Sequence, residues 1–426
     1  MRRHALVLMM ALAVGTQAAM GIAGADPVPA SPLPDPGVPN AEFYTPPAPL
    51  PSGSAGDLLR TEPSRVVLDF VTNAPIDAHA TRIMYLSRTN HGEPTAVTGT
   101  VLAPTRPWTG PGERPLVSFA AGTQGVGDQC APSHLMNRGH FYEIPWVGSL
   151  LAYGAAVVVT DYQGLGTPGL HTYLNRAAEA HAQLDATRAA QRLGDPEIPA
   201  DGPVGLMGYS QGGHSTASAV ELQPTYAPEL DVIGAYAGAA PANVAESIAG
   251  ADGSIASGFF GFIFNGAVAG YPEHADALRS TLTPAGEAVL RDTETQCTAD
   301  TILTYPLQWV STYNKDGLPG VEQAKTEPMR SILDEQRIGR LKPAAPVLIV
   351  QGAHDDLVLA EQSRQLGRDW CAQGADVQFR QLDIPLLPPR LILGHGTPLP
   401  FAQIEGISWL VDRVEGRPFA GNCGTY

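Results

Sequence analysis

Residues 203–213 read Pro203-Val204-Gly205-Leu206-Met207-Gly208-Tyr209-Ser210-Gln211-Gly212-Gly213, and small residues with spaced apolar ones follow up to Leu222. This order predicts a buried strand, a tight turn and a helix, which is the context of a G-x-S-x-G nucleophile elbow. Such a turn holds its serine in a strained conformation at the head of a sheet, and its glycines leave room for the strand and helix. The next N–H, that of Gln211, lies at a helix N-terminus, where it can bind a developing oxyanion. Unless the pentapeptide is a chance occurrence in a chain with 46 glycines, Ser210 is the expected nucleophile.

Apolar runs on either side of the elbow predict the other strands of a sheet. We expect strands over residues 82–88, 96–102, 115–120, 155–160, 232–236, 346–350 and 377–382, the first beginning near Arg82. The first two flank a polar turn at residues 90–93 and predict an antiparallel hairpin. The later continuous runs, separated by helical stretches such as 174–193, are typical of buried parallel strands. The chain is therefore expected to form an α/β fold with a mostly parallel sheet flanked by helices.

One stretch interrupts this alternation. Between residues 242 and 342 there is no convincing strand, and helical patterns cover residues 258–264 and 304–313. We expect a helical cap here, inserted between two parts of the α/β domain (57–241 and 343–426) over the carboxyl ends of the strands. Four aromatic residues of the cap fit its core better than the lining of an acyl tunnel; they are Phe259, Phe260, Phe262 and Phe264.

The N-terminus has the pattern of an export signal. Arg2 and Arg3 precede an apolar run, and Ala23-Gly24-Ala25 forms an A-x-A cleavage site, so residues 1–25 are expected to be a signal peptide. The run is too short to cross a bilayer, and we expect no transmembrane segment elsewhere. Residues 26–56 are rich in Pro, Ser, Gly and Ala, which predicts an arm without packed secondary structure.

Charge and cysteine content restrict the partners. The formal net charge of -16 disfavours a nucleic acid, because a polyanion would be repelled. The four cysteines are even in number and stand in an export context, which favours two disulfides over metal ligands or free thiols. No pair has the C-x-x-C spacing of a zinc site, and three disulfide connectivities remain open.

A serine nucleophile needs a base, and the base needs an acid that orients it. In the α/β-hydrolase order both follow the serine, on loops after late strands. Asp355 and Asp356 follow the strand expected at 346–350. Asp355 is preferred because it precedes Val358 by three residues, the D-x-x-V spacing, whereas Asp356 fits the N-cap of a helix over 359–371.

The expected base is His395, the only histidine after Asp355, which lies between two glycines and before a helix expected over 401–414. His214 lies one helical turn after the elbow and is interpreted as a packing residue, and His274 is a further rival. His354 fits a supporting or surface position. A metal site at residues 354–356 is disfavoured because consecutive residues do not easily converge on one ion.

The second oxyanion donor is expected on the loop after an earlier strand. The HGGG form is absent, and a glycine-rich turn over residues 119–128 stands in its place. A backbone N–H near Thr123 or Gln124 can serve as the donor; the alternative is an ordinary glycine turn.

With these pieces placed, the chain resembles the secretory lipases of the Candida antarctica lipase A type, in their actinobacterial branch of the α/β-hydrolase superfamily. The likeness covers nearly all of the chain after the expected signal peptide. It rests on residues 43–47, 122–125, 128–133, 161–166 and 208–213, on Asp355 with Val358, and on Asn422-Cys423.

The resemblance implies Ser210 as nucleophile, His395 as base and Asp355 as acid, with oxyanion N–H groups from Gln124 and Gln211. It also implies disulfides between Cys130 and Cys297 and between Cys371 and Cys423. One departure is the long apolar stretch 384–393 before His395, which could form a flap over the acyl site.

These features together predict a secreted serine carboxylic-ester hydrolase that needs no cofactor or metal, with triacylglycerols as substrates and a role in lipid catabolism. The expected partner is a lipid or ester, with transient contact with a lipid interface and retention in the cell wall left open. The alternatives are a general esterase, an acyltransferase on cell-envelope lipids, a serine peptidase and a non-catalytic lipid-binding protein. The presence of all three triad residues argues against the last of these.

Overall fold

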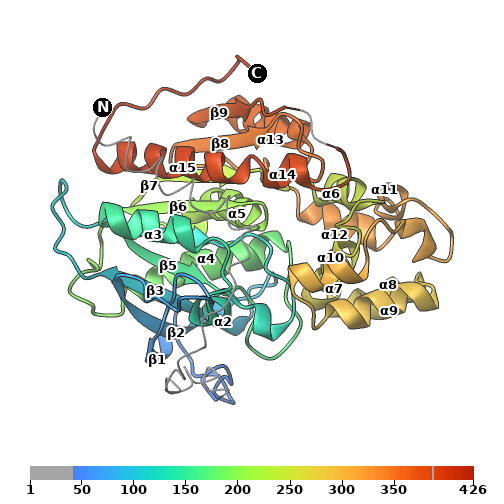
Figure 1. Ribbon diagram of the computed structural model, residues 1–426, viewed down its shortest axis with the longest axis horizontal. Helices are drawn as coiled ribbons and strands as arrows, with labels where there is room; N and C mark the ends of the chain where they lie inside the picture. The colour runs from blue at the N-terminus through green and yellow to red at the C-terminus, as the bar shows by residue number, and fades with distance from the viewer. Residues whose placement is uncertain (1–41, 386–387) are drawn as a thin grey trace, which may run out of the picture.

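The computed structural model describes residues 42–385 and 388–426, so the expected signal peptide and residues 26–41 of the arm lie outside the described residues. A sheet of nine strands, in the order β1-β2-β3-β5-β4-β6-β7-β8-β9, crosses the molecule (Figure 1). The strands are β1 (Leu58–Ser64), β2 (Ala78–Arg88), β3 (Pro94–Pro104), β4 (Leu116–Ala120), β5 (Ala156–Thr160), β6 (Val204–Tyr209), β7 (Val232–Gly238), β8 (Val347–Gly352) and β9 (Val377–Leu382). From β5 to β9 all neighbours are parallel, which confirms the expected fold class.

The antiparallel edge begins earlier than expected. The hairpin of β2 and β3 is present, but the prediction that strands begin near Arg82 is wrong, because β1 precedes it and β2 starts at Ala78. β1 is an edge strand whose side chains are exposed or only half-buried. Its sequence therefore lacks the apolar alternation by which half-buried strands are recognised.

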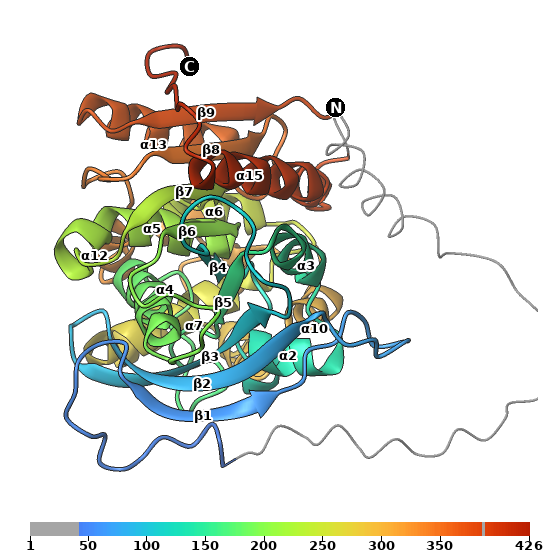
Figure 2. The ribbon, with the colours of Figure 1, turned by 90° about the vertical axis from the view of Figure 1, so that its left-hand side faces the viewer.

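Helices cover both faces of the sheet, as Figure 2 shows. On one face lie α3 (Ile144–Tyr153) and α15 (Leu399–Val414), and on the other α4 (Arg176–Gln191), α5 (Gln211–Tyr226) and α13 (Ala360–Ala372). Strands β4, β5, β6 and β8 are buried along their whole length. Burial from both sides explains why these strands read as continuous apolar runs.

Several helices stand between β7 and β8, and Figure 1 shows them gathered at one end of the sheet. They are α6 (Val244–Ala251), α7 (Phe259–Gly270), α8 (Ala275–Ser280), α9 (Pro284–Thr293), α10 (Thr298–Thr304), α11 (Gly320–Gln323) and α12 (Met329–Glu335). One buried cluster joins the rings of α7 to Tyr173 and Leu174, after β5, and to Leu357 and Val358, after β8. These helices therefore cover the carboxyl ends of the parallel strands. The exact domain boundaries stay a prediction.

Two details of this region concern the sequence-based expectations. The helix expected over 304–313 is wrong, because α10 ends at Thr304 and only a 3-10 turn (Val310–Thr312) follows. Pro306 is the reason, since a residue before proline is disfavoured in the helical conformation. The four phenylalanines of residues 259–264 are all buried in the cluster, which is the environment expected of core side chains.

The described end of the N-terminal arm packs on the sheet. Residues 42–56 contain no helix or strand, and Phe43 and Tyr44 are buried against Met84 and Ala96. The Tyr44 hydroxyl also hydrogen bonds to Ser133, at 2.8 Å. In the described part of the chain, no helix has both the length and the hydropathy needed to cross a membrane.

Two disulfides join Cys130 to Cys297 and Cys371 to Cys423, which is the pairing that the resemblance implied. The first connects the 3-10 turn η1 (Asp128–Cys130) to the residue before α10. The second connects α13 to the C-terminal segment beside β9. Both therefore hold together segments that are distant along the chain.

Loss of the first disulfide should weaken the fold measurably. It closes a loop of 167 residues, so a Cys130→Ala/Cys297→Ala double variant is expected to lose about 4 kcal/mol of the free energy of unfolding. Guanidinium unfolding followed by circular dichroism measures this loss. The matched control is Cys371→Ala/Cys423→Ala. This variant removes the second disulfide, which joins residues 52 apart in the sequence and does not involve the loop after β4. An unchanged unfolding midpoint in the first variant would contradict the prediction.

Candidate active site

The turn between β6 and α5 has the strained geometry of an elbow. Ser210 lies at φ 59° and ψ −121°, a conformation that non-glycine residues rarely adopt. A side chain at Gly208 would place its Cβ 2.3 Å from the carbonyl oxygen of Gly212, and one at Gly212 would lie 2.0 Å from that of Ala120. Only glycine fits at both positions, which is the physical reason for the G-x-S-x-G pattern here.

The structure brings Ser210, His395 and Asp355 together. Nε2 of His395 lies 2.9 Å from Oγ of Ser210, and Nδ1 lies 2.8 Å from Oδ2 of Asp355. His395 is on the short helix α14 (Leu393–Gly396), and its carbonyl oxygen accepts a hydrogen bond from the Tyr209 hydroxyl at 2.8 Å. Since a carboxylate accepts the Nδ1 proton, Nε2 is left free to take the proton of Ser210.

The two neighbouring aspartates have different positions. Asp355 is buried, and its Oδ1 accepts the N–H groups of Leu357 and Val358 at 3.0 and 2.8 Å. Asp356 instead accepts the backbone N–H of His395 at 3.3 Å. The interpretation of Asp356 as the N-cap of the following helix is wrong, because the N-cap residue of α13 is Leu359.

The other histidines lie in different surroundings. His354 is exposed and faces Asp383 at 3.6 Å, and His274 belongs to the 3-10 turn η2 (Pro272–His274) between α7 and α8. His214 is fully buried, but its interpretation as a packing residue was incomplete, since its Nδ1 lies 2.7 Å from Oε2 of Glu179. It is part of a polar network beneath the elbow.

This network contains a carboxylate that the sequence analysis missed. Oε1 of the buried Glu179 accepts hydrogen bonds from the side-chain amide of Gln211 at 2.8 Å and from the N–H of Leu174 at 2.9 Å. The amide of Gln211 also lies 2.9 Å from Nε2 of His171. The Gln211 side chain is thus held by Glu179 and His171. In the sequence, Glu179 was recognisable only as a glutamate among the small residues of α4.

Both expected oxyanion donors have unpaired N–H groups. Within residues 42–385 and 388–426, the backbone N–H groups of Gln124 and Gln211 donate to no protein acceptor. The loop that carries Gln124 follows β4, and the carbonyl oxygen of Gln124 accepts the N–H of Thr298 at 2.9 Å. The hydroxyl of Thr298 also donates to the carbonyl oxygen of Thr123, at 2.9 Å. The first residue of α10 therefore helps to hold this loop.

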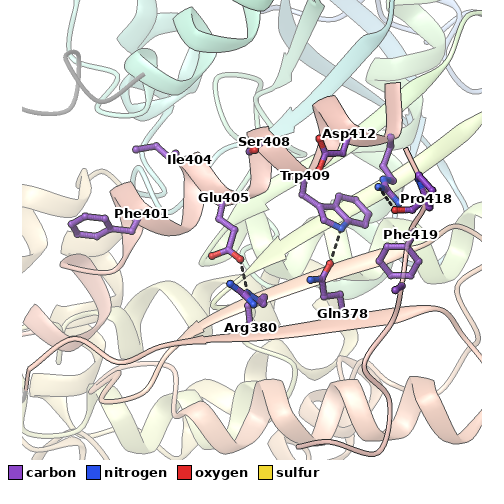
Figure 3. A pocket seen from close by; sticks show the side chains of 12 residues that line it. Gln378, Arg380, Phe401, Ile404, Glu405, Ser408, Trp409, Asp412, Pro418 and Phe419 are labelled. Carbon is purple, nitrogen blue, oxygen red and sulfur yellow. Dashed lines mark hydrogen bonds and ion pairs between the residues drawn. The ribbon is translucent and has the colours of Figure 1, made fainter. Parts of the chain in front are cut away.

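A large groove lies elsewhere on the molecule. It has a volume of about 930 Å³ and is lined by α15, β9 and the C-terminal segment (Figure 3). An ion pair between Arg380 and Glu405 and a hydrogen bond from Trp409 to Gln378 connect its walls. None of the side chains of Ser210, Asp355 and His395 lines this groove. This groove is therefore distinct from the candidate active site.

Comparison with known proteins gives a consistent result. A sequence profile of the family described as secretory lipase matches residues 133–422. A secreted triacylglycerol lipase of Malassezia globosa is 30% identical over 308 residues, which cover 69% of this chain and 62% of that protein, less than two thirds of its length. A Mycobacterium tuberculosis protein described as a probable inactive lipase is 27% identical over 384 residues, 88% of this chain and 82% of that protein.

Solved structures support the fold. Candida antarctica lipase A in its closed state superposes with a TM-score of 0.78 at 23% identity, over 93% of this chain and 90% of that one. The rice cell wall degrading esterase LipA of Xanthomonas oryzae gives a TM-score of 0.70 at 20% identity, over 85% and 100%. At these identities the similarity concerns the α/β-hydrolase fold alone.

Proposed function

The chain belongs to the secretory lipase family, and from this we propose that it is a secreted serine carboxylic-ester hydrolase whose substrates are triacylglycerols. The observation that carries the proposal is the line of hydrogen bonds from Asp355 through His395 to Ser210, at the head of the elbow. A family of secretory proteins and two disulfides support a location outside the cytoplasm.

In the proposed reaction Ser210 attacks the ester carbonyl carbon while Nε2 of His395 takes the hydroxyl proton. The carbonyl oxygen becomes negatively charged and accepts hydrogen bonds from the backbone N–H groups of Gln124 and Gln211. Asp355 stabilises the imidazolium ion of His395. His395 then protonates the departing alcohol oxygen, which leaves Ser210 acylated. Water attacks this acyl group by the same steps, and a fatty acid and free Ser210 result.

One relative makes a non-catalytic protein the alternative to exclude. The Mycobacterium tuberculosis protein described as a probable inactive lipase aligns with 88% of this chain. In this chain the serine, histidine and aspartate are all present and within hydrogen-bond distance of each other in series. This arrangement favours an active enzyme.

A substrate series tests the proposal. We expect the protein to hydrolyse p-nitrophenyl esters from butyrate to palmitate and to release fatty acid from emulsified triolein. Titration of released acid and chromatography of the products measure both. Activity confined to the short esters would make the protein an esterase, and transfer of the acyl group to an added alcohol would make it an acyltransferase. Protein treated with a fluorophosphonate serves as the control, because a modified serine cannot be acylated.

A further inference from the structure

A carboxyl group lies behind the loop that carries Gln124. Glu143 precedes α3, and its side chain is fully buried. Its Oε2 accepts the backbone N–H of Gly122 at 2.7 Å and lies 3.4 Å from the side-chain amide nitrogen of Gln124. Its Oε1 accepts a hydrogen bond from the side-chain amide of Gln403, on α15, at 3.3 Å.

This burial needs an explanation, because removing a carboxyl group from water is unfavourable unless hydrogen bonds or charges compensate it. Among the described residues, Glu143 forms no ion pair with a lysine, arginine or histidine. Its compensation comes from donors on the loop after β4 and from Gln403. The reaction scheme uses neither Glu143 nor its charge.

The loop is closely packed around Gly122. A Cβ at Gly122 would lie 2.6 Å from the Tyr142 hydroxyl oxygen and 3.2 Å from the carbonyl oxygen of Tyr209, the residue before the nucleophile. The far end of the loop is held by Thr298, and the Thr123 hydroxyl lies 2.8 Å from that of Tyr173. At the other end, Glu143 accepts the N–H of Gly122, and the Tyr162 hydroxyl donates to the carbonyl oxygen of Ala121 at 2.7 Å.

We propose that Glu143 is a positioning residue of the oxyanion hole, which anchors the loop at Gly122 so that the N–H of Gln124 faces the oxygen that becomes negatively charged. The proposal rests on the proposed function for its consequence in catalysis, but the anchoring itself is independent of any substrate. Removing the acceptor would leave a buried N–H without a partner and free the loop to shift.

The protonation state of Glu143 favours this position. Burial raises the pKa of Glu143 to about 8, so the group is mostly neutral at pH 7 and adds little negative charge behind the oxyanion. Tyr142 beside it is exposed, whereas Tyr162 after β5 and Tyr236 on β7 are buried, and burial raises the pKa of these two hydroxyls well above the usual value. These tyrosine hydroxyls stay neutral over the pH range of the kinetic measurements. In the described part of the chain, Oε1 of Gln403 has no partner, so a rotated Gln403 amide can accept the carboxyl proton.

Two substitutions separate anchoring from charge. Glu143→Gln keeps an acceptor for the Gly122 N–H, and its amide group can face a rotated Gln403, so kcat should stay within about threefold of wild type. Glu143→Leu removes the acceptor at similar volume, and kcat on p-nitrophenyl butyrate should fall about 100-fold with KM nearly unchanged, as for a lost oxyanion donor. Equal loss of kcat in both variants would overturn the proposal.

The pH profile adds a readout that a purely structural role would not change. Above the pKa of Glu143 the wild type acquires a negative charge near the developing oxyanion, so kcat should fall as the pH rises through about 8. In Glu143→Gln this decrease should be absent, because the amide does not ionise. The same decrease in both proteins would show that Glu143 does not act on the oxyanion.

The control and the closing measurement use the whole chain. Glu221 is also buried and accepts the N–H of Gly339 at 2.6 Å and that of the Trp370 indole at 2.7 Å, near the other end of α5. Glu221→Leu should lower the melting temperature without changing kcat of the folded protein. Hydrogen–deuterium exchange of peptides covering residues 119–128 should rise in Glu143→Leu and stay at the wild-type level in Glu143→Gln and Glu221→Leu. Unchanged exchange in Glu143→Leu overturns the anchoring even if the wild type hydrolyses no ester, a result that would refute the proposed function separately.

Discussion

Replacing Ser210 by alanine is expected to lower kcat for ester hydrolysis by about six orders of magnitude, with the melting temperature nearly unchanged. Without Oγ no acyl-enzyme can form, and the residual rate comes only from binding and the oxyanion donors. Alanine keeps the Cβ atom that makes the φ of 59° unfavourable, so the backbone strain at this position is retained. Steady-state rates with p-nitrophenyl butyrate and thermal unfolding measure the two effects.

A second serine provides the control for this substitution. Ser149 lies half-buried on α3, and its hydroxyl donates to the carbonyl oxygen of Pro145 at 2.8 Å. Ser149→Ala should retain wild-type kcat and should still be labelled by a fluorophosphonate, whereas Ser210→Ala should not. Hydrolysis that survives in Ser210→Ala would mean that the elbow does not carry the nucleophile.

Replacing Asp355 by asparagine is expected to lower kcat about 10³- to 10⁴-fold, whereas Asp356→Asn should cost less than about tenfold. Both backbone N–H groups that reach Asp355 donate to Oδ1, so the asparagine oxygen should take that place. Its NH2 group would then face Nδ1 of His395. The imidazole would be held with its proton on Nε2, where it cannot accept the proton of Ser210.

Asp356 is the matched control because it contacts the same histidine at a different atom. Its Oδ1 accepts the backbone N–H of His395 at 3.3 Å, which an asparagine oxygen can also do. Rates measured from pH 6 to 9 on both folded variants separate the two roles. A larger loss in Asp356→Asn than in Asp355→Asn would reverse the assignment that the D-x-x-V spacing suggested.

Much of the scaffold was predictable because its signals are local. The strands β4 to β8 read as apolar runs since helices bury them on both faces, and the elbow has a strand before it and a helix after it. β1 escaped prediction because an edge strand needs no apolar alternation, and the helix expected over 304–313 was wrong because helical spacing was read past Pro306. The disulfide pairing followed from the resemblance, since spacing alone left three connectivities.

The supporting carboxyl groups could not be predicted in the same way. Glu143 and Glu179 look like ordinary surface residues in the sequence, yet both are fully buried. Glu143 accepts the backbone N–H of Gly122, on the loop of Gln124, and Glu179 accepts a hydrogen bond from the side chain of Gln211. Whether a glutamate is buried depends on segments far along the chain that supply its donors, and no periodicity of the sequence records them.

The amino-acid sequence by itself determined the elements whose causes are local: the elbow, the buried strands, and the residue types of the triad in their order. The tertiary structure decided which aspartate faces His395, what holds the loop of Gln124, and which polar groups are buried. The physical reason is range. Propensity, periodicity and turn geometry act between neighbours in the chain, whereas hydrogen bonds across 185 residues, such as that between Ser210 and His395, exist only after the sheet has brought the strand ends together.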